Sequence, residues 1–145
     1  NNIIDHADAT KFYYKLYFTH SDVHIIISDN GRGLFGHIKS LLELENIQVA
    51  AVEVAKGYVT TDPDYHSGDE LNTVIHLFDK VTIDASGKSL SFINKTQDWM
   101  INHSTQQQGT RIHLEIETGS KRTCQKIFKR IFNSKHRSKY SDRCS

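Results

Sequence analysis

The sequence lacks the features that define several large classes of protein. Of 145 residues, only two are cysteines and one is proline, and both cysteines, Cys124 and Cys144, lie in the last quarter. Two cysteines cannot build a disulfide-dense scaffold or a cysteine-rich zinc module, and low cysteine use is typical of a reducing cytoplasm. No apolar run approaches the ~18–20 residues that a membrane-spanning helix needs, and no signal-peptide pattern opens the sequence. We therefore expect a cytoplasmic protein with no membrane segment.

Charge is distributed unevenly along the chain. Residues 1–118 hold nine Lys and Arg against sixteen Asp and Glu, whereas residues 119–145 hold nine Lys and Arg against Asp142 alone. The formal net charge of +1 therefore combines an acidic body with a basic tail. An acidic body disfavours broad nucleic-acid binding by its surface. We expect residues 1–118 to form one domain and residues 119–145 to form a basic tail, helical at first and disordered from Ser134 onward.

Hydrophobic periodicity predicts an α+β domain. Alternating residues predict strands over 11–18 and 23–28, joined as a hairpin, and later strands over 80–84, 89–93, 98–102 and 110–117. Helical spacing predicts one helix through Ile38, Leu41, Leu42 and Glu45, a second that ends at Gly57, and a third from Leu71 to Phe78. Helices come early and strands late. This order predicts a two-layer α/β sandwich, with a mixed, mostly antiparallel sheet and helices on one face.

The strongest local signal for a binding site is the segment Asp29-Asn30-Gly31-Arg32-Gly33, which follows an apolar strand. A carboxylate at the end of a strand can accept a hydrogen bond from an exocyclic amine, such as that of adenine. Gly31 and Gly33 permit a positive φ and a close approach of the backbone to a ligand. Taken alone, the same pattern also occurs in ordinary turns between a strand and a loop.

Three further segments add weaker signals. Asn2 and Asp5 share one side of a predicted helix, and an Asn amide oxygen can complete the ligand shell of Mg²⁺. Gly68 precedes a predicted helix start, where backbone N–H groups can bind phosphate. Gly109-Thr110 forms a turn into the last strand. Each segment also has a plain structural interpretation, as a polar helix face, a capped surface loop or a simple turn.

In this order, the segments resemble the GHKL ATPase superfamily, whose members include gyrase B, MutL, histidine kinases and the anti-sigma serine kinases. The resemblance covers about residues 1–118 and is closest to bacterial stand-alone histidine-kinase-like ATP-binding domains. The motifs that carry it are Asn1-Asn2-Ile3-Ile4-Asp5-His6, Asp29-Asn30-Gly31-Arg32-Gly33, the segment from Gly57 to Gly68 with Thr60-Thr61-Asp62-Pro63, Phe78-Asp79, Asp98-Trp99 and Gly109-Thr110. The resemblance implies a Bergerat-type fold that binds ATP and Mg²⁺ between its helices and its sheet.

The resemblance also implies roles for individual residues. Asn2 would coordinate Mg²⁺, with Asp5 beside it in the pocket. Asp29 would bind adenine directly, and Thr110 would bond the adenine site through water. The residues that would border the base, the phosphates and the lid are Gly31, Gly33, His66, Ser67 and Gly68.

The implied function is adenine-nucleotide binding by a domain of a bacterial regulatory or signalling protein, with a regulator or a sigma-factor-type target as its protein partner. The family's ATPase and kinase activities use a general-base Glu one helical turn before the Asn that binds Mg²⁺. That position would precede Asn1, so we assign no catalytic residue and expect an N-terminally truncated domain. Two other functions stay open, a nucleotide-free interaction module whose pocket has decayed and a nucleic-acid binder that uses the basic tail.

The remaining conspicuous residues favour plain structural roles. No spacing of His or Cys predicts a zinc site, so we expect His24 and His113 to be surface residues of strands. An apolar stripe through Cys124, Ile127, Phe128, Ile131 and Phe132 has helical spacing. We expect this stripe to pack on the body or on another domain rather than on a membrane.

Overall fold

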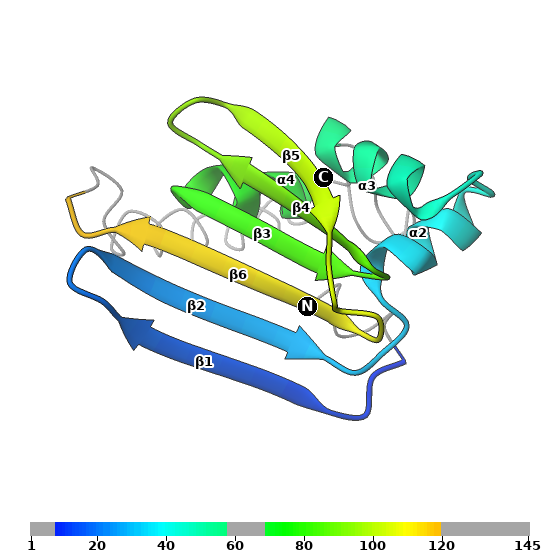
Figure 1. Cartoon of the computed structure of the whole chain (residues 1–145), viewed down its shortest axis with the longest axis horizontal. Helices are drawn as coiled ribbons and strands as arrows, with labels where there is room; N and C mark the ends of the chain where they lie inside the picture. Colours follow the sequence, from blue (N-terminus) through cyan, green and yellow to red (C-terminus); the bar gives the residue numbers. More distant parts are fainter. Residues whose placement is uncertain (1–7, 58–68, 120–145) are drawn as a thin grey trace, which may run out of the picture.

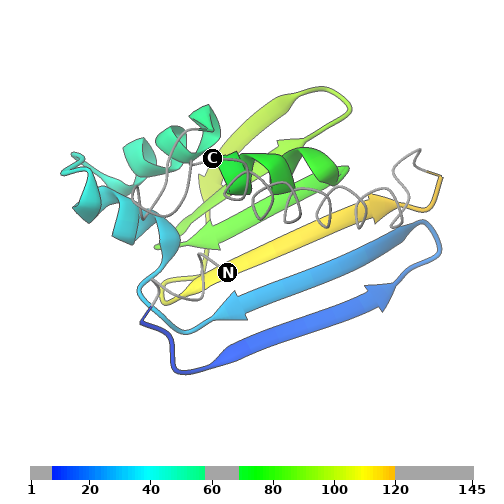
Figure 2. The ribbon, with the colours of Figure 1, turned by 180° about the vertical axis from the view of Figure 1, so that it is seen from behind.

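The computed structural model describes residues 8–57 and 69–119, which form a six-stranded sheet with helices on one of its faces (Figure 1, Figure 2). The strands are β1 (Phe12–Phe18), β2 (Asp22–Asp29), β3 (Lys80–Ala85), β4 (Lys88–Ile93), β5 (Asp98–His103) and β6 (Thr110–Glu117). The helices are α2 (Leu34–Leu41), α3 (Ile47–Lys56) and α4 (Asp69–Leu77). The predicted α+β class and the placement of helices on one face are therefore confirmed.

The strand order in the sheet is β1-β2-β6-β3-β4-β5, and every neighbouring pair is antiparallel. We expected a mixed, mostly antiparallel sheet. The antiparallel character is confirmed, but the expected parallel component is absent from the described strands. β2 and β3 run in the same direction, but β6 lies between them and pairs antiparallel with both. This insertion of the last strand brings the carboxyl end of β2 beside the start of β6.

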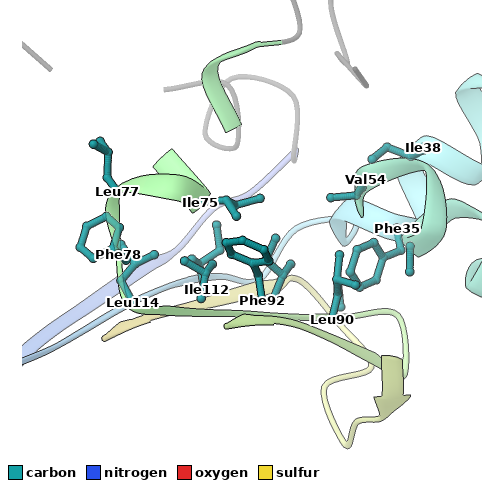
Figure 3. Close-up of a cluster of buried hydrophobic side chains, with 14 of the residues drawn as sticks. Phe35, Ile38, Val54, Ile75, Leu77, Phe78, Leu90, Phe92, Ile112 and Leu114 are labelled. Carbon is teal, nitrogen blue, oxygen red and sulfur yellow. The ribbon is translucent and has the colours of Figure 1, made fainter. Parts of the chain in front are cut away.

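The hydrophobic core fills the space between the sheet and the helices (Figure 3). Along β6, Ile112, Leu114 and Ile116 are buried on the face that the helices cover, while the residues between them point to the other face. Phe92 of β4 and Phe35 of α2 lie among the largest fully buried side chains. Burial of each large apolar side chain contributes roughly 1.5–3 kcal/mol, so this layer supplies much of the fold's stability.

Capping residues set the ends of the helices. The Asn46 side chain accepts a hydrogen bond from the Val49 amide at 3.0 Å, which caps the start of α3. Gly57 ends α3 in the left-handed conformation, with φ of 86°, as the sequence predicts. The helix predicted through Leu42 and Glu45 instead ends at Leu41. The described helices include none long and apolar enough to cross a lipid bilayer.

β1 is an edge strand whose side chains are largely exposed. Tyr14 and Phe18 are 82% and 71% exposed, and Phe12 and Leu16 are also exposed. These four residues lie on the same face as Ile25 and the core residues of β6, because Leu16 lies opposite Ile25 and Ile25 lies opposite Leu114. The core is therefore concentrated on the central strands rather than spread across the sheet.

Candidate functional site

Asp29 occupies the last position of β2, on the face of the sheet that carries the helices. The residue is only 7% exposed. The Oδ1 atom accepts hydrogen bonds from the backbone N–H groups of Gly31, at 2.8 Å, and Thr110, at 3.3 Å. One donor belongs to the loop after β2 and the other to β6, and together they fix the orientation of the carboxylate.

The second oxygen of the same carboxylate is unusual. Asp29 Oδ2 is buried and has no hydrogen-bond partner among residues 8–57 and 69–119. A buried acceptor without a donor costs about 1–3 kcal/mol, and a charged one costs more. An arrangement of this kind suits a ligand that brings its own N–H donor to Oδ2.

Glycines allow the two backbone segments around Asp29 to touch. Gly109 has a φ of 72° and donates its N–H to the Gly31 carbonyl at 2.9 Å. A Cβ at Gly109 would lie only 1.9 Å from the Asp29 carbonyl oxygen, so no other residue fits there without a shift of the backbone. Gly33 has the positive φ that we expected, at 86°, whereas Gly31 does not, and it contributes its N–H to Asp29 instead.

Thr110 joins the start of β6 to the start of α2. It is 2% exposed, and its Oγ1 accepts a hydrogen bond from the Leu34 amide at 2.8 Å. Leu34 is the first residue of α2 and directly follows Gly33. A hydroxyl that accepts a hydrogen bond still has its own proton to donate. The structure therefore brings together Asp29, Gly31, Gly33 and Thr110, four of the residues that the sequence singled out.

Asn30 and Arg32 anchor the loop after β2 to the segment before β1. The sequence alone predicted no role for either residue. Asn30 Oδ1 accepts hydrogen bonds from the backbone N–H groups of Thr10 and Lys11, at 3.0 and 2.9 Å. The Arg32 guanidinium donates a hydrogen bond to the Asp8 carboxylate and lowers the pKa of that carboxyl group. These contacts fix the loop after β2 to the chain that leads into β1.

Five predicted site residues fall in parts of the chain that the structure does not describe. They are Asn2, Asp5, His66, Ser67 and Gly68. Their predicted positions around Mg²⁺ and the phosphates therefore stay predictions.

A second polar cluster lies on the opposite face of the same two central strands. His24 Nδ1 of β2 lies 2.9 Å from His113 Nε2 and 3.7 Å from Glu115 Oε1, both of β6. We expected both histidines at the surface, and for His24 this is wrong, since it is only 8% exposed. The ring of Tyr17 on β1 covers it, stacked at 4.6 Å between ring centroids with an interplanar angle of 5°.

The electrostatics of this second cluster follow from its partial burial. Desolvation lowers the pKa of His113, and the nearby Glu115 carboxylate opposes that shift.

Sequence reasoning missed the cluster because 89 residues separate His24 from His113, and no local spacing reveals their contact. The available signal was weak, because only the strand of His113 alternates between apolar and polar residues, whereas Ile26 shares the face of His24.

Comparison with known proteins does not place the chain in a family. No family model matches it, and no curated protein matches it either.

Proposed function

We propose that this chain is an adenine-nucleotide-binding domain of the GHKL type, with a Bergerat-type fold, and that it binds ATP with Mg²⁺ within a bacterial regulatory or signalling protein. The observation that carries the proposal is the Asp29 carboxylate. One of its oxygens is held by two backbone N–H groups, and the other is buried without a partner in the described part of the chain.

The chemistry of Asp29 favours adenine over guanine. Adenine presents an exocyclic amine, which donates hydrogen bonds, where guanine presents a carbonyl oxygen, which only accepts them. A carboxylate oxygen attracts the first and repels the second. A hydrogen bond to a charged group contributes about 1.5–3 kcal/mol, or roughly ten- to a hundredfold in affinity.

The surroundings of Asp29 fit a flat base next to the sheet. Gly33 and Gly109 keep side chains away from the turns on either side of the carboxylate. The Thr110 hydroxyl, which accepts from the Leu34 amide, has a proton left to donate to a water molecule at the base. By resemblance, Asn2 would coordinate Mg²⁺ and Asp5 would line the pocket beside it. His66, Ser67 and Gly68 would contact the phosphates. Bound Mg²⁺ would offset the negative charge of those phosphates.

Isothermal titration with ATP, ADP and GTP tests the proposal through the variant Asp29→Asn. We expect the variant to bind ATP and ADP roughly ten- to a hundredfold more weakly than the unsubstituted chain, because it loses the charge-assisted hydrogen bond. GTP should bind poorly to the unsubstituted chain.

The matched control is Asp84→Asn, which removes a carboxylate from β3 on the face of the sheet opposite the helices and should leave ATP affinity unchanged. Unchanged ATP affinity in Asp29→Asn, with native circular dichroism, would refute the assignment. Absence of ATP binding to the unsubstituted chain would instead favour the interaction module with a decayed pocket.

A further inference from the structure

We propose that His24, His113 and Glu115 form a binding site for a divalent transition-metal ion, with Zn²⁺ as the preferred ion. The site lies on the face of the sheet opposite the helices. It shares no residue with the Asp29 cluster, and it does not depend on nucleotide binding.

The sheet register places the three side chains together. His24 of β2 lies directly opposite Glu115 of β6, and His113 lies two residues before Glu115 in β6. Side chains two residues apart on a strand share a face, so all three point to the same side. Their ligand atoms all lie within 4.8 Å of one another.

The distances between these atoms fit a single small cation. Zinc bonds of about 2.0–2.1 Å to nitrogen and oxygen in a tetrahedral site place neighbouring ligand atoms roughly 3.3–3.4 Å apart. The separation between His24 Nδ1 and His113 Nε2 is 2.9 Å, and that between His24 Nδ1 and Glu115 Oε1 is 3.7 Å. The two values bracket the tetrahedral separation, so small side-chain rotations would complete the site.

The donor set selects the class of metal. Two imidazoles and one carboxylate suit Zn²⁺, Co²⁺, Ni²⁺ and Cu²⁺, whereas Mg²⁺ and Ca²⁺ prefer oxygen ligands throughout. Three protein ligands leave one tetrahedral position for water or another ligand, as in zinc sites that exchange their fourth ligand. The site is therefore chemically distinct from one that would hold Mg²⁺ with ATP.

Neighbouring residues both support and oppose the site. Tyr17 stacks on the His24 ring and restricts its rotation, and Asp22 Oδ2 lies 4.0 Å from His24 Nε2. A carboxylate near the second ring nitrogen of a ligating histidine helps to hold the tautomer that binds metal. Against this, the ammonium group of Lys80 lies 3.9 Å from Glu115 Oε2 and competes with a cation for that carboxylate.

The test is isothermal titration of the full chain with Zn²⁺, in a background where Cys124→Ser and Cys144→Ser remove competing thiols. We expect His113→Gln and Glu115→Gln each to weaken Zn²⁺ binding by at least about tenfold, since even outer partners of a metal ligand typically matter that much. The matched controls are His103→Gln and Glu117→Gln, which replace exposed residues of β5 and β6 and should not change the affinity. Lys80→Met should tighten binding, because it removes the competing cation.

A second measurement needs no substitution in the site and so does not depend on how the variants fold. Long-range ¹H–¹⁵N spectra report the ring nitrogens of all nine histidines. Sub-stoichiometric Zn²⁺ should shift the His24 and His113 resonances before those of the other seven. The proposal is overturned if other histidines respond first, if Zn²⁺ does not bind, or if affinity survives in both His113→Gln and Glu115→Gln.

Discussion

At Gly109, two turns that are distant in sequence pack backbone against backbone. The space for a side chain is occupied by the Asp29 carbonyl, and the Gly109 N–H bonds to the Gly31 carbonyl. This contact positions the Thr110 amide against Asp29 Oδ1. The orientation of the candidate adenine-binding carboxylate therefore depends on a glycine that need not touch the ligand.

We predict that Gly109→Ala lowers the free energy of unfolding by about 1–3 kcal/mol or more, since this range is the usual cost of a strained backbone conformation alone. The added Cβ would meet the Asp29 carbonyl at 1.9 Å, and the positive φ disfavours any L side chain. Urea unfolding measures the change. Gly119→Ala, where a Cβ would meet nothing within 4 Å, is the matched control and should be close to neutral. Equal stability of the two variants would show that this close approach does not exist in solution.

The sequence predicts the residues of the candidate site better than it predicts their contacts. The resemblance named Asp29, Gly31, Gly33 and Thr110, which the structure brings together. The anchoring roles of Asn30 and Arg32 were not predicted, because their partners precede β1 and share no local pattern with them.

Among the strands, packing differs sharply between the centre of the sheet and its edge. Phe92 of β4 is 1% exposed and packs against the rings of His76 and Trp99. Phe18 of β1, by contrast, is largely exposed. Two phenylalanines in strands of one sheet therefore have very different surroundings, and a pair of substitutions can compare them.

We predict that Phe92→Ala lowers the free energy of unfolding by about 3–5 kcal/mol, because it leaves a cavity in the core. Phe18→Ala should change it by less than about 0.5 kcal/mol, as is usual for exposed positions. Thermal or chemical denaturation of both variants provides the comparison. A large loss on Phe18→Ala would mean that β1 is covered in solution.

The local pattern of apolar and polar residues was sufficient to predict the strands. Their observed limits lie within one residue of those expected. This pattern did not predict where α2 begins. The amide of Leu34, the first residue of α2, is bonded to Thr110, a residue 76 positions away. The same limit applies to the sheet, since no local signal indicates that β6 lies between β2 and β3. Pairings of this kind are set by the burial of one face across the whole domain.

In the molecule as a whole, β2 and β6 carry both candidate sites. The Asp29 cluster lies at one end of this strand pair on the face that the helices cover, and the cluster of His24, His113 and Glu115 lies on the other face. Because successive residues of a strand point to opposite faces, one strand pair can support two separate sites. Each of the two proposals can therefore be refuted without affecting the other.

Adenine binding at Asp29 can be observed at the site itself by an NMR titration of the ¹⁵N-labelled full chain with ADP. The amides of Gly31 and Thr110 donate to Asp29, and that of Leu34 donates to Thr110. We expect these three resonances to be among the first to shift and the shifts to saturate, whereas GDP at the same concentration should leave them in place. A saturable response confined to other residues, or an equal response to GDP, would contradict it.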